Sequence, residues 1–327
     1  MRIGLRLPSF ALGERTASLQ EMGAYLRRAE DLGFETAMLI DHLLVAPPAY
    51  RVTWLEPMAL LSGLAGVTRT IRLGTMVLVL PFRDPVYFAK EWATLDVLSG
   101  GRSILGVGVG WNEAEFAALR IPHRERGRRT TEMLEAITAL WAGDHVSYEG
   151  RHYQFREVTI EPKPIQRPHP PIWIGGGTQP SERIYGQEVP SIEPVLRRIA
   201  TYATTWVPHS SATAEMVATD LEQIRGYMVE QGRDPDDLST VYSNFIHVLE
   251  PGEEPEAAAP YFSVYSGMDL GYWQQFYLLG EAEAVAERIR GKIEALGGVD
   301  HLILNPLDWD PRRLDVLAER VVPLVTA

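Results

Sequence analysis

The amino-acid sequence predicts a (β/α)₈ TIM barrel with insertions, in which a closed ring of eight parallel strands is surrounded by helices and forms one domain over residues 1–327. Three observations predict this fold. Short apolar segments alternate with amphipathic helical segments, eight candidate strands can be counted, and 327 residues with 46% hydrophobic content suffice for one large core. A doubly wound parallel sheet is the alternative for the same alternation.

The eight expected strands are short and apolar. They span residues 3–7, 34–40, 71–80, 103–109, 172–174, 204–207, 240–248 and 299–304. Helix signals stand between them. Ser18 is a candidate N-cap and Gly33 a candidate helix stop, while Asp84 followed by Pro85 is typical of a helix start. Further helices are expected around residues 131–141, 213–230, 281–296 and 311–322.

Two segments interrupt this alternation and are expected to be insertions. Residues 145–156 indicate a β-hairpin with Glu149-Gly150 at its turn. Residues 251–279 begin with an acidic, alanine-rich stretch and continue with a cluster of aromatic residues. Long insertions at the C-terminal face of a barrel often exclude water or select substrates, so we expect a partly mobile lid, with a dimer contact as the alternative.

Composition excludes several function classes. The chain has no cysteine, which excludes thiolate nucleophiles, iron–sulfur clusters and disulfides. Its formal net charge of −12 argues against nucleic-acid binding. The N-terminus lacks a signal-peptide pattern, and no apolar run approaches the length of a membrane span. We therefore expect a cytoplasmic protein that contacts neither nucleic acid nor membrane, and the histidine spacing indicates no metal site.

In a barrel of this kind, functional side chains lie where the strands end at the C-terminal face. Asp41 and His42 follow the second strand, where a neutral imidazole can exchange a proton near pH 7, although a structural histidine is the commoner case. The glycine-rich run 106–112 lacks the third glycine of a dinucleotide fingerprint. It indicates either tight strand packing or backbone approach to a flat ring.

The turn that follows the fifth strand is a candidate phosphate site. It consists of Gly175, Gly176, Gly177 and Thr178, whose N–H groups and hydroxyl can form an anion-binding concavity. A flexible turn without a ligand is the alternative. Arg183, Arg197 and Arg198 lie nearby in sequence and are candidates for balancing a phosphate charge.

Residues 71–119 and 126–141 resemble the luciferase-like flavin-dependent oxidoreductases, most closely the subgroup that uses the deazaflavin coenzyme F420. The match extends through YEGRHYQF, EPKPIQRPHPPIWIGGGT and VDHLILNP. The resemblance implies a barrel that is usually dimeric and that holds the flavin or deazaflavin ring at its C-terminal mouth.

The resemblance also implies roles for individual residues. Asp41 would lie beside the ring and His42 would act as the base or proton donor. A cis peptide bond between Met76 and Val77 would support the ring face. The other implied ring contacts are Val79, Val109 and Gly110, and the implied phosphate contacts are Gly176, Gly177 and Thr178.

Two departures limit the transfer. The sugar-phosphate dehydrogenases of the subgroup have a catalytic glutamate where this chain has Trp111, so their substrate is not implied. Residues 179–194 intervene between the glycine turn and the next helix, and Ser191 is therefore a candidate N-cap and phosphate donor.

Three functions remain open. The first is an oxidoreductase that transfers hydride between F420 and a small organic substrate. The second is an FMN-dependent monooxygenase on the same fold. The third is a non-catalytic flavin-binding barrel.

Overall fold

A computed structural model describes residues 1–11, 16–47, 49–179 and 191–326 of the chain. Its centre is a closed ring of eight parallel strands, which confirms the predicted barrel. In order around the ring these are β1 (Arg2–Arg6), β3 (Thr36–Leu39), β5 (Arg72–Thr75), β7 (Ser103–Gly108), β10 (Ile172–Gly175), β11 (Thr205–Val207), β12 (Ser239–Val248) and β14 (His301–Asn305). The ring closes where β7 pairs with β10.

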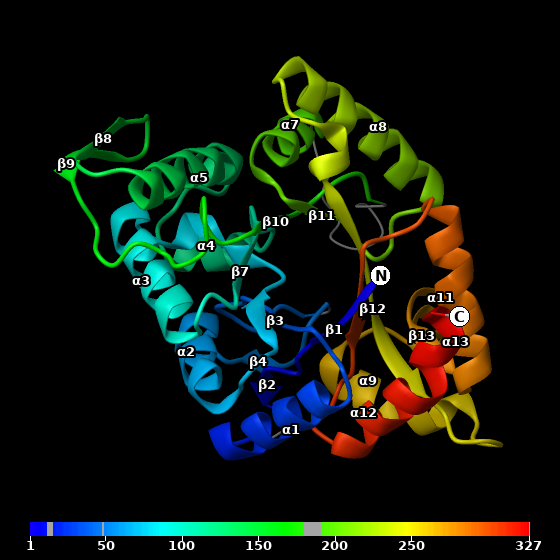
Figure 1. Cartoon of the computed structure of the whole chain (residues 1–327). Coiled ribbons are helices and arrows are strands. Elements are labelled where there is room, and N and C mark those ends of the chain that lie inside the picture. The colour runs from blue at the N-terminus through cyan, green and yellow to red at the C-terminus, as the bar shows by residue number, and fades with distance from the viewer. Residues whose placement is uncertain (12–15, 48, 180–190, 327) are drawn as a thin grey trace.

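Helices surround the ring (Figure 1). The α-helices are α1 (Leu19–Asp31), α2 (Pro57–Val67), α3 (Pro85–Leu98), α4 (Glu113–Ala118), α5 (Arg126–Ala142), α7 (Glu193–Tyr202), α8 (Ala214–Glu230), α9 (Ala259–Tyr265), α10 (Leu270–Phe276), α11 (Ala282–Ala295), α12 (Pro311–Val316) and α13 (Val322–Thr326). The caps of α1 and α3 are as predicted. Ser18 and Glu21 form a capping box, and the Asp84 side chain accepts from the first turn of α3. In the described ranges, no helix is long and apolar enough to span a membrane.

The third strand differs from the prediction of one strand over residues 71–80. It divides into β5 and the short β6 (Leu78–Val79), and a 3₁₀ turn over Leu80–Phe82 follows. Both strands pair with β7, so the interruption keeps the chain at the same place in the ring. The Met76–Val77 peptide bond between them is cis, as the resemblance implied.

The core has two main layers and a third cluster at the mouth. A large cluster fills the space between the barrel and its helices. A smaller one, including Met38, Trp173 and Ile303, fills the barrel interior. The third cluster joins Phe245 of β12 to aromatic residues of the segment 251–279 and to Trp54. Trp54 belongs to β4 (Thr53–Trp54), which pairs with β2 (Phe10–Ala11).

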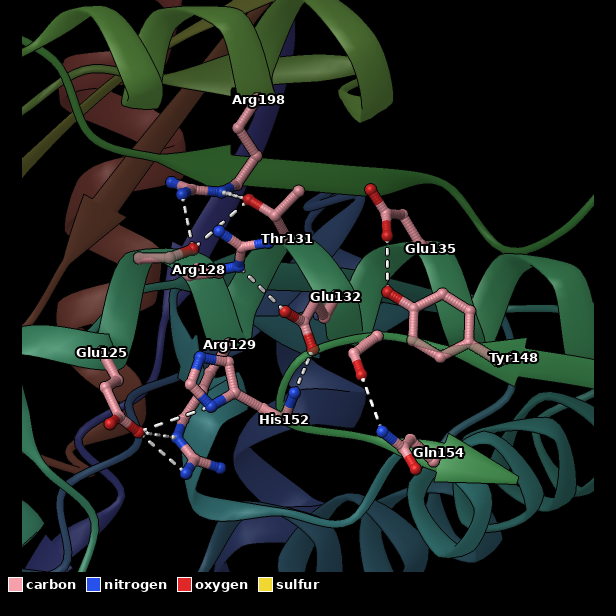
Figure 2. Close-up of polar contacts among 12 residues, drawn as sticks. Glu125, Arg128, Arg129, Thr131, Glu132, Glu135, Tyr148, His152, Gln154 and Arg198 are labelled. Atoms are coloured by element: carbon pink, nitrogen blue, oxygen red, sulfur yellow. Dashed lines mark hydrogen bonds and ion pairs between the residues drawn. The ribbon is translucent and has the colours of Figure 1, made fainter.

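The predicted hairpin is formed by β8 (Val146–Glu149) and β9 (Gln154–Val158), and it projects beside α5 at the edge of the molecule (Figure 1). Two carboxylates of α5 hold it there. Glu135 accepts a hydrogen bond from the Tyr148 hydroxyl at 2.5 Å, and Glu132 accepts one from the His152 N–H at 2.7 Å (Figure 2). The hairpin is therefore fixed to the outside of the barrel.

Candidate active site at the barrel mouth

A cavity of about 310 Å³ opens at the C-terminal ends of the barrel strands. Its walls are formed by short loops after the strands and by the aromatic segment 251–279. Its lining includes the following residues: Arg6, Asp41, His42, Tyr50, Met76, Val77, Val79, Gly108, Val109, Gly110, Trp111, Glu115, Gly175, Gly176, Gln179, His209, Ser210, Ser211, Ser243, Phe245, Ser266, Met268, Tyr272, Phe276 and Tyr277. Most of the residues singled out from the sequence therefore meet in one place.

His42 is held by a buried carboxylate. Its Nδ1 lies 3.0 Å from Oε1 of Glu115, whose side chain is only 1% exposed. The same oxygen accepts the N–H groups of Leu43 and Leu44 at 2.8 and 3.1 Å. A carboxylate on Nδ1 favours the tautomer with the proton on that nitrogen, which leaves Nε2 for proton exchange. Tyr50 packs against the imidazole, with ring centroids 5.0 Å apart.

Asp41 also lines the cavity, but its carboxylate has partners within the protein. Oδ2 accepts the Val79 N–H at 2.9 Å and Nη1 of Arg83 at 2.7 Å. Arg83 in turn reaches Glu56 at 3.2 Å. Burial lowers the pKa of Arg83, but the attraction of Asp41 and Glu56 outweighs burial and leaves that pKa raised. Asp41 therefore fixes the floor of the cavity at Val79.

The glycines of β7 and of the turn directly after it fall into two groups. A Cβ on Gly106 would lie 1.8 Å from the Thr75 carbonyl oxygen, so this position is fixed by strand packing. Gly108 and Gly110 line the cavity, and a Cβ on them would meet the side chains of Val77 and Val79 at 2.5 and 2.7 Å. These glycines leave room for the two valines, which form an apolar floor to the cavity.

The turn after β10 is less open than the sequence indicated. The Thr178 N–H and hydroxyl both donate to the buried carboxylate of Asp220, at 2.5 and 2.7 Å. The Gly176 N–H donates to the Val207 carbonyl at 3.2 Å. Gly175 and Gly176 line the cavity, whereas Gly177 and Thr178 are not among its lining residues. The Asp220 carboxylate thus occupies donors that a phosphate was expected to use.

The nearby arginines do not reach this turn. Arg198 is buried against α5, where it donates to Thr131 at 3.0 Å and to the Gly127 carbonyl at 2.7 Å (Figure 2). Arg197 pairs with Glu193 and Glu230 on the surface. Arg183 lies outside the described residues.

The expected helix cap at Ser191 is wrong. Helix α7 begins at Glu193, its N-cap is Ile192, and no side chain caps it. Ser191 is one residue too early to cap the first turn, and it is exposed and away from the cavity lining.

A second histidine lies in the cavity beyond β11. The Nδ1 atom of His209 lies 2.6 Å from the Ser211 hydroxyl. Burial, with a smaller contribution from the charge of Arg6, lowers the pKa of His209 to about 4. His209 is therefore neutral at pH 7 and acts as a hydrogen-bonding group.

The segment 251–279 forms one wall of the cavity. The lining residues from this segment include Met268, Tyr272, Phe276 and Tyr277. Tyr265 packs behind them, with its ring centroid 4.7 Å from that of Phe245. Tyr265 and Trp273 are buried in the monomer itself. The placement agrees with the expected lid, while its mobility stays a prediction.

Several residues of the site were not singled out from the sequence, and Glu115 and Arg6 are the charged ones among them. Glu115 is 73 positions from His42 and is the third residue of α4. At this position a glutamate is expected to bond back to the N-cap residue, Asn112, and not to a distant histidine. No local sequence pattern indicates that the Glu115 side chain contacts His42. Arg6 carries a signal: it alternates with the apolar Ile3, Leu5 and Leu7, so it faces the barrel interior. In the described part of the chain, no cluster of three metal-ligating side chains is found.

Known proteins similar to this chain belong to a family of oxidoreductases. Residues 1–269 match the model of the luciferase-like monooxygenase family. The FMNH2-dependent dimethylsulfone monooxygenase of Pseudomonas putida is 29% identical over 54% of this chain and 45% of its own length. The F420-dependent glucose-6-phosphate dehydrogenase of Microbacterium testaceum is 37% identical over 49% of this chain and 47% of its own. The match thus spans about half the length of these curated relatives.

Solved structures show the same fold along the whole chain. A monooxygenase from Streptomyces bottropensis superposes with a TM-score of 0.77 at 24% identity, covering 99% of both chains. An F420-dependent secondary alcohol dehydrogenase superposes with a TM-score of 0.78 at 18% identity, covering 99% of this chain and 98% of the other. With most of its sequence matched by the family model, the chain belongs to the luciferase-like monooxygenase family.

Proposed function

We propose that this protein is an oxidoreductase that transfers hydride between F420 and a small organic substrate, with His42 as the proton donor or acceptor. The observation that carries the proposal is the His42–Glu115 pair, 3.0 Å apart in the wall of the cavity. Hydride transfer to or from a carbonyl or alcohol carbon requires a proton to move at the oxygen. An imidazole oriented by a buried carboxylate supplies that proton.

The cavity suits a flavin-like ring. Val77 and Val79 form an apolar floor that lies close to the glycines at 108 and 110, where a Cβ would meet these valines. When bound, the deazaflavin ring supplies the hydride-transferring carbon. Met76, Val109 and Gly110 would complete the ring contacts, and Asp41 would hold Val79 in place rather than transfer a proton, because Arg83 already neutralises it.

The phosphate end of the cofactor would lie toward β10 and β11. Gly175 and Gly176 line the cavity there beside the hydroxyls of Ser210 and Ser211. Thr178 already donates to Asp220, the Gly176 N–H donates to the Val207 carbonyl, and the Ser211 hydroxyl lies 2.6 Å from Nδ1 of His209. We therefore assign the phosphate contact to Ser210, with Gly176 and Gly177 shaping the turn. Gly176 has φ +146°, and a Cβ there would lie 2.6 Å from Val195, so a larger residue would displace this wall.

An FMN-dependent monooxygenase is the second candidate. It is favoured by the match to the dimethylsulfone monooxygenase, whose name states its dependence on FMNH2. The same floor and the same His42 would serve reduced FMN. The cofactor therefore distinguishes the two functions.

Anaerobic binding titrations of F420, FMN and reduced FMN on the same protein test the proposal. F420 should bind more tightly than either form of FMN. Binding is measured from the absorbance and fluorescence changes of the ring. Tighter binding of reduced FMN, with oxygen consumption on addition of air, would replace the first function with the second. If no form binds, the chain is not a redox enzyme of either kind.

The protein is proposed to be a homodimer, and the segment 251–279 is proposed to act as a lid. The alternative role of this segment is a contact between the two subunits. Hydrogen exchange separates these roles. A lid gains protection when cofactor and substrate bind, whereas protection that is complete without ligand and depends on protein concentration indicates a dimer contact.

A further inference from the structure

The cavity holds a cation that the proposed proton transfer does not use. Arg6 is the last residue of β1, and its side chain lines the cavity at the barrel mouth. The guanidinium carbon stands 4.6 Å from the centre of the Phe245 ring. Nε of Arg6 is buried, and it has no hydrogen-bond partner in the part of the chain that the structure describes.

The carboxylates of the cavity cannot balance this charge, because both have other partners. Asp41 binds Arg83 at 2.7 Å and the Val79 N–H. Glu115 binds Nδ1 of His42 and two backbone N–H groups. Among the described lining residues, Asp41 and Glu115 are the acidic ones. Arg6 therefore has no free carboxylate to pair with among the described residues that line the cavity.

The surroundings of Arg6 combine aromatic surface with a few neutral polar groups. Phe245 and Tyr277, whose ring centroids lie 4.9 Å apart, both line the cavity, and so does Phe276. The Ser243 hydroxyl shares hydrogen bonds with Asn305 at 3.2 and 3.3 Å. Planar bidentate anions such as carboxylates match the fork of a guanidinium, and the aromatic walls match an apolar body attached to that anion.

The barrel topology separates Arg6 from the glycine turn after β10, whereas Ser210 and Ser211, which follow β11, lie three strands from β1 on one side. Around the ring of eight strands, β1 and β10 are four strands apart in either direction. The turn at Gly175 and Gly176 therefore lies across the mouth from Arg6. A cofactor whose phosphate is bound near β10 and β11 leaves Arg6 available to another ligand.

We propose that Arg6 binds a carboxylate group of the substrate and so selects substrates with an aromatic or apolar body and one anionic end. The proposal rests on the assignment of the cavity as the active site. The carboxylate would pair with the guanidinium, and the body of the substrate would lie in the cavity against the lining rings of Phe245, Phe276 and Tyr277.

Benzoate and its neutral, near-isosteric amide benzamide are the probes. Their binding to the cofactor-free protein is measured by saturation-transfer NMR, which detects weak ligands. Benzoate should bind wild-type protein more tightly than benzamide, by roughly 10- to 100-fold, as expected for a charge-assisted pair. Arg6→Met should abolish this preference, because methionine keeps the packing over Phe245 but removes the charge. Arg6→Lys should retain part of it.

Arg2→Met is the matched control, since it removes the same charge from the other, exposed end of β1. It should leave the preference unchanged. Thermal unfolding confirms that each variant is folded, and if Arg6→Met is not, Arg6→Lys decides by reducing the preference. Equal binding of benzoate and benzamide to wild type, or a preference that survives in the Arg6 variant, overturns the proposal.

A second experiment tests whether Arg6 binds the cofactor phosphate instead of a substrate carboxylate. FMN and riboflavin, which differ by the phosphate, are titrated on wild type and Arg6→Met. Unchanged affinities support the substrate role. A selective loss of FMN affinity assigns Arg6 to the cofactor phosphate and overturns it. Because the benzoate measurement needs no cofactor, failure of the redox function would appear separately, as absence of F420 and FMN binding in wild type.

Discussion

His42 and His209 line the same cavity from different strands and have opposite environments. His42 is bound through Nδ1 to the Glu115 carboxylate. His209 meets the hydroxyl of Ser211 and the field of Arg6, and its pKa is lowered to about 4. One imidazole thus has an anion to stabilise a transferred proton, and the other is kept neutral. The contrast favours His42 over His209 for the proposed acid–base chemistry, because of the carboxylate beside it rather than its place at a strand end.

His42→Ala is expected to have the largest effect. Turnover should fall by about 10²–10⁴-fold while cofactor affinity stays unchanged, because the imidazole is proposed to supply a proton and not to support the ring. The measurement is the steady-state rate together with a cofactor titration. His145→Ala, on the exposed hairpin, is the control. A rate within threefold of wild type would remove His42 from the chemistry.

Glu115→Gln should have a smaller effect. Glutamine keeps an oxygen for the N–H groups of Leu43 and Leu44 but gives His42 no charge, so the rate should fall by roughly 10- to 100-fold. The kcat should fall with little change in cofactor affinity. Glu113→Gln, on the same helix and exposed, serves as the control. A Glu115→Gln variant as active as wild type would show that the carboxylate only supports the loop.

His209 should lower the stability of the protein at acid pH. Its folded pKa of about 4 lies below the ordinary 6.5, so the unfolded chain binds this proton first as the pH falls. The free energy of unfolding should therefore decrease from about pH 6.5 down to about pH 4, by up to about 3 kcal/mol for this residue. Urea titrations at several pH values should give a shallower dependence for His209→Gln, and His145→Gln should behave as wild type. Identical slopes would mean that His209 is not buried as described.

Asp220→Asn should have the smallest effect among these variants. Asparagine can accept the Thr178 N–H and donate to the Thr178 hydroxyl, but it gives neither contact a charge, so the free energy of unfolding should fall by about 1–3 kcal/mol. Removing the negative charge should also strengthen FMN binding relative to riboflavin, if the phosphate lies near this turn. Asp236→Asn, which is exposed, is the control. An unchanged FMN-to-riboflavin ratio would place the phosphate elsewhere.

Local sequence signals predicted the barrel and its caps well. Ser18 and Asp84 mark their helices because capping depends on residues three positions apart. Helix α2 (Pro57–Val67) was not expected, since its apolar residues and two glycines do not form a single helical stripe. The break of the third strand at Met76–Val77 was expected only from the family resemblance.

The polar pairings of the site were beyond local signals. Glu115 meets His42 and Asp220 meets Thr178 over separations of 73 and 42 positions, which only the folded chain brings together. The sequence placed Thr178 and His42 correctly at strand ends, but it does not show which donors are already occupied. Arg6 is different, because strand alternation alone directs it inward.

The position of Arg6 affects how quickly charged molecules reach the site. The chain carries a net charge of −12, whereas the Arg6 guanidinium lies inside the mouth among neutral and already paired groups. An approaching anion is repelled by the distant surface and attracted only within about a Debye length, near 10 Å at 0.1 M salt. Added salt screens the long-range repulsion more than the short-range attraction. Anions should therefore associate faster as ionic strength rises, the reverse of electrostatic steering.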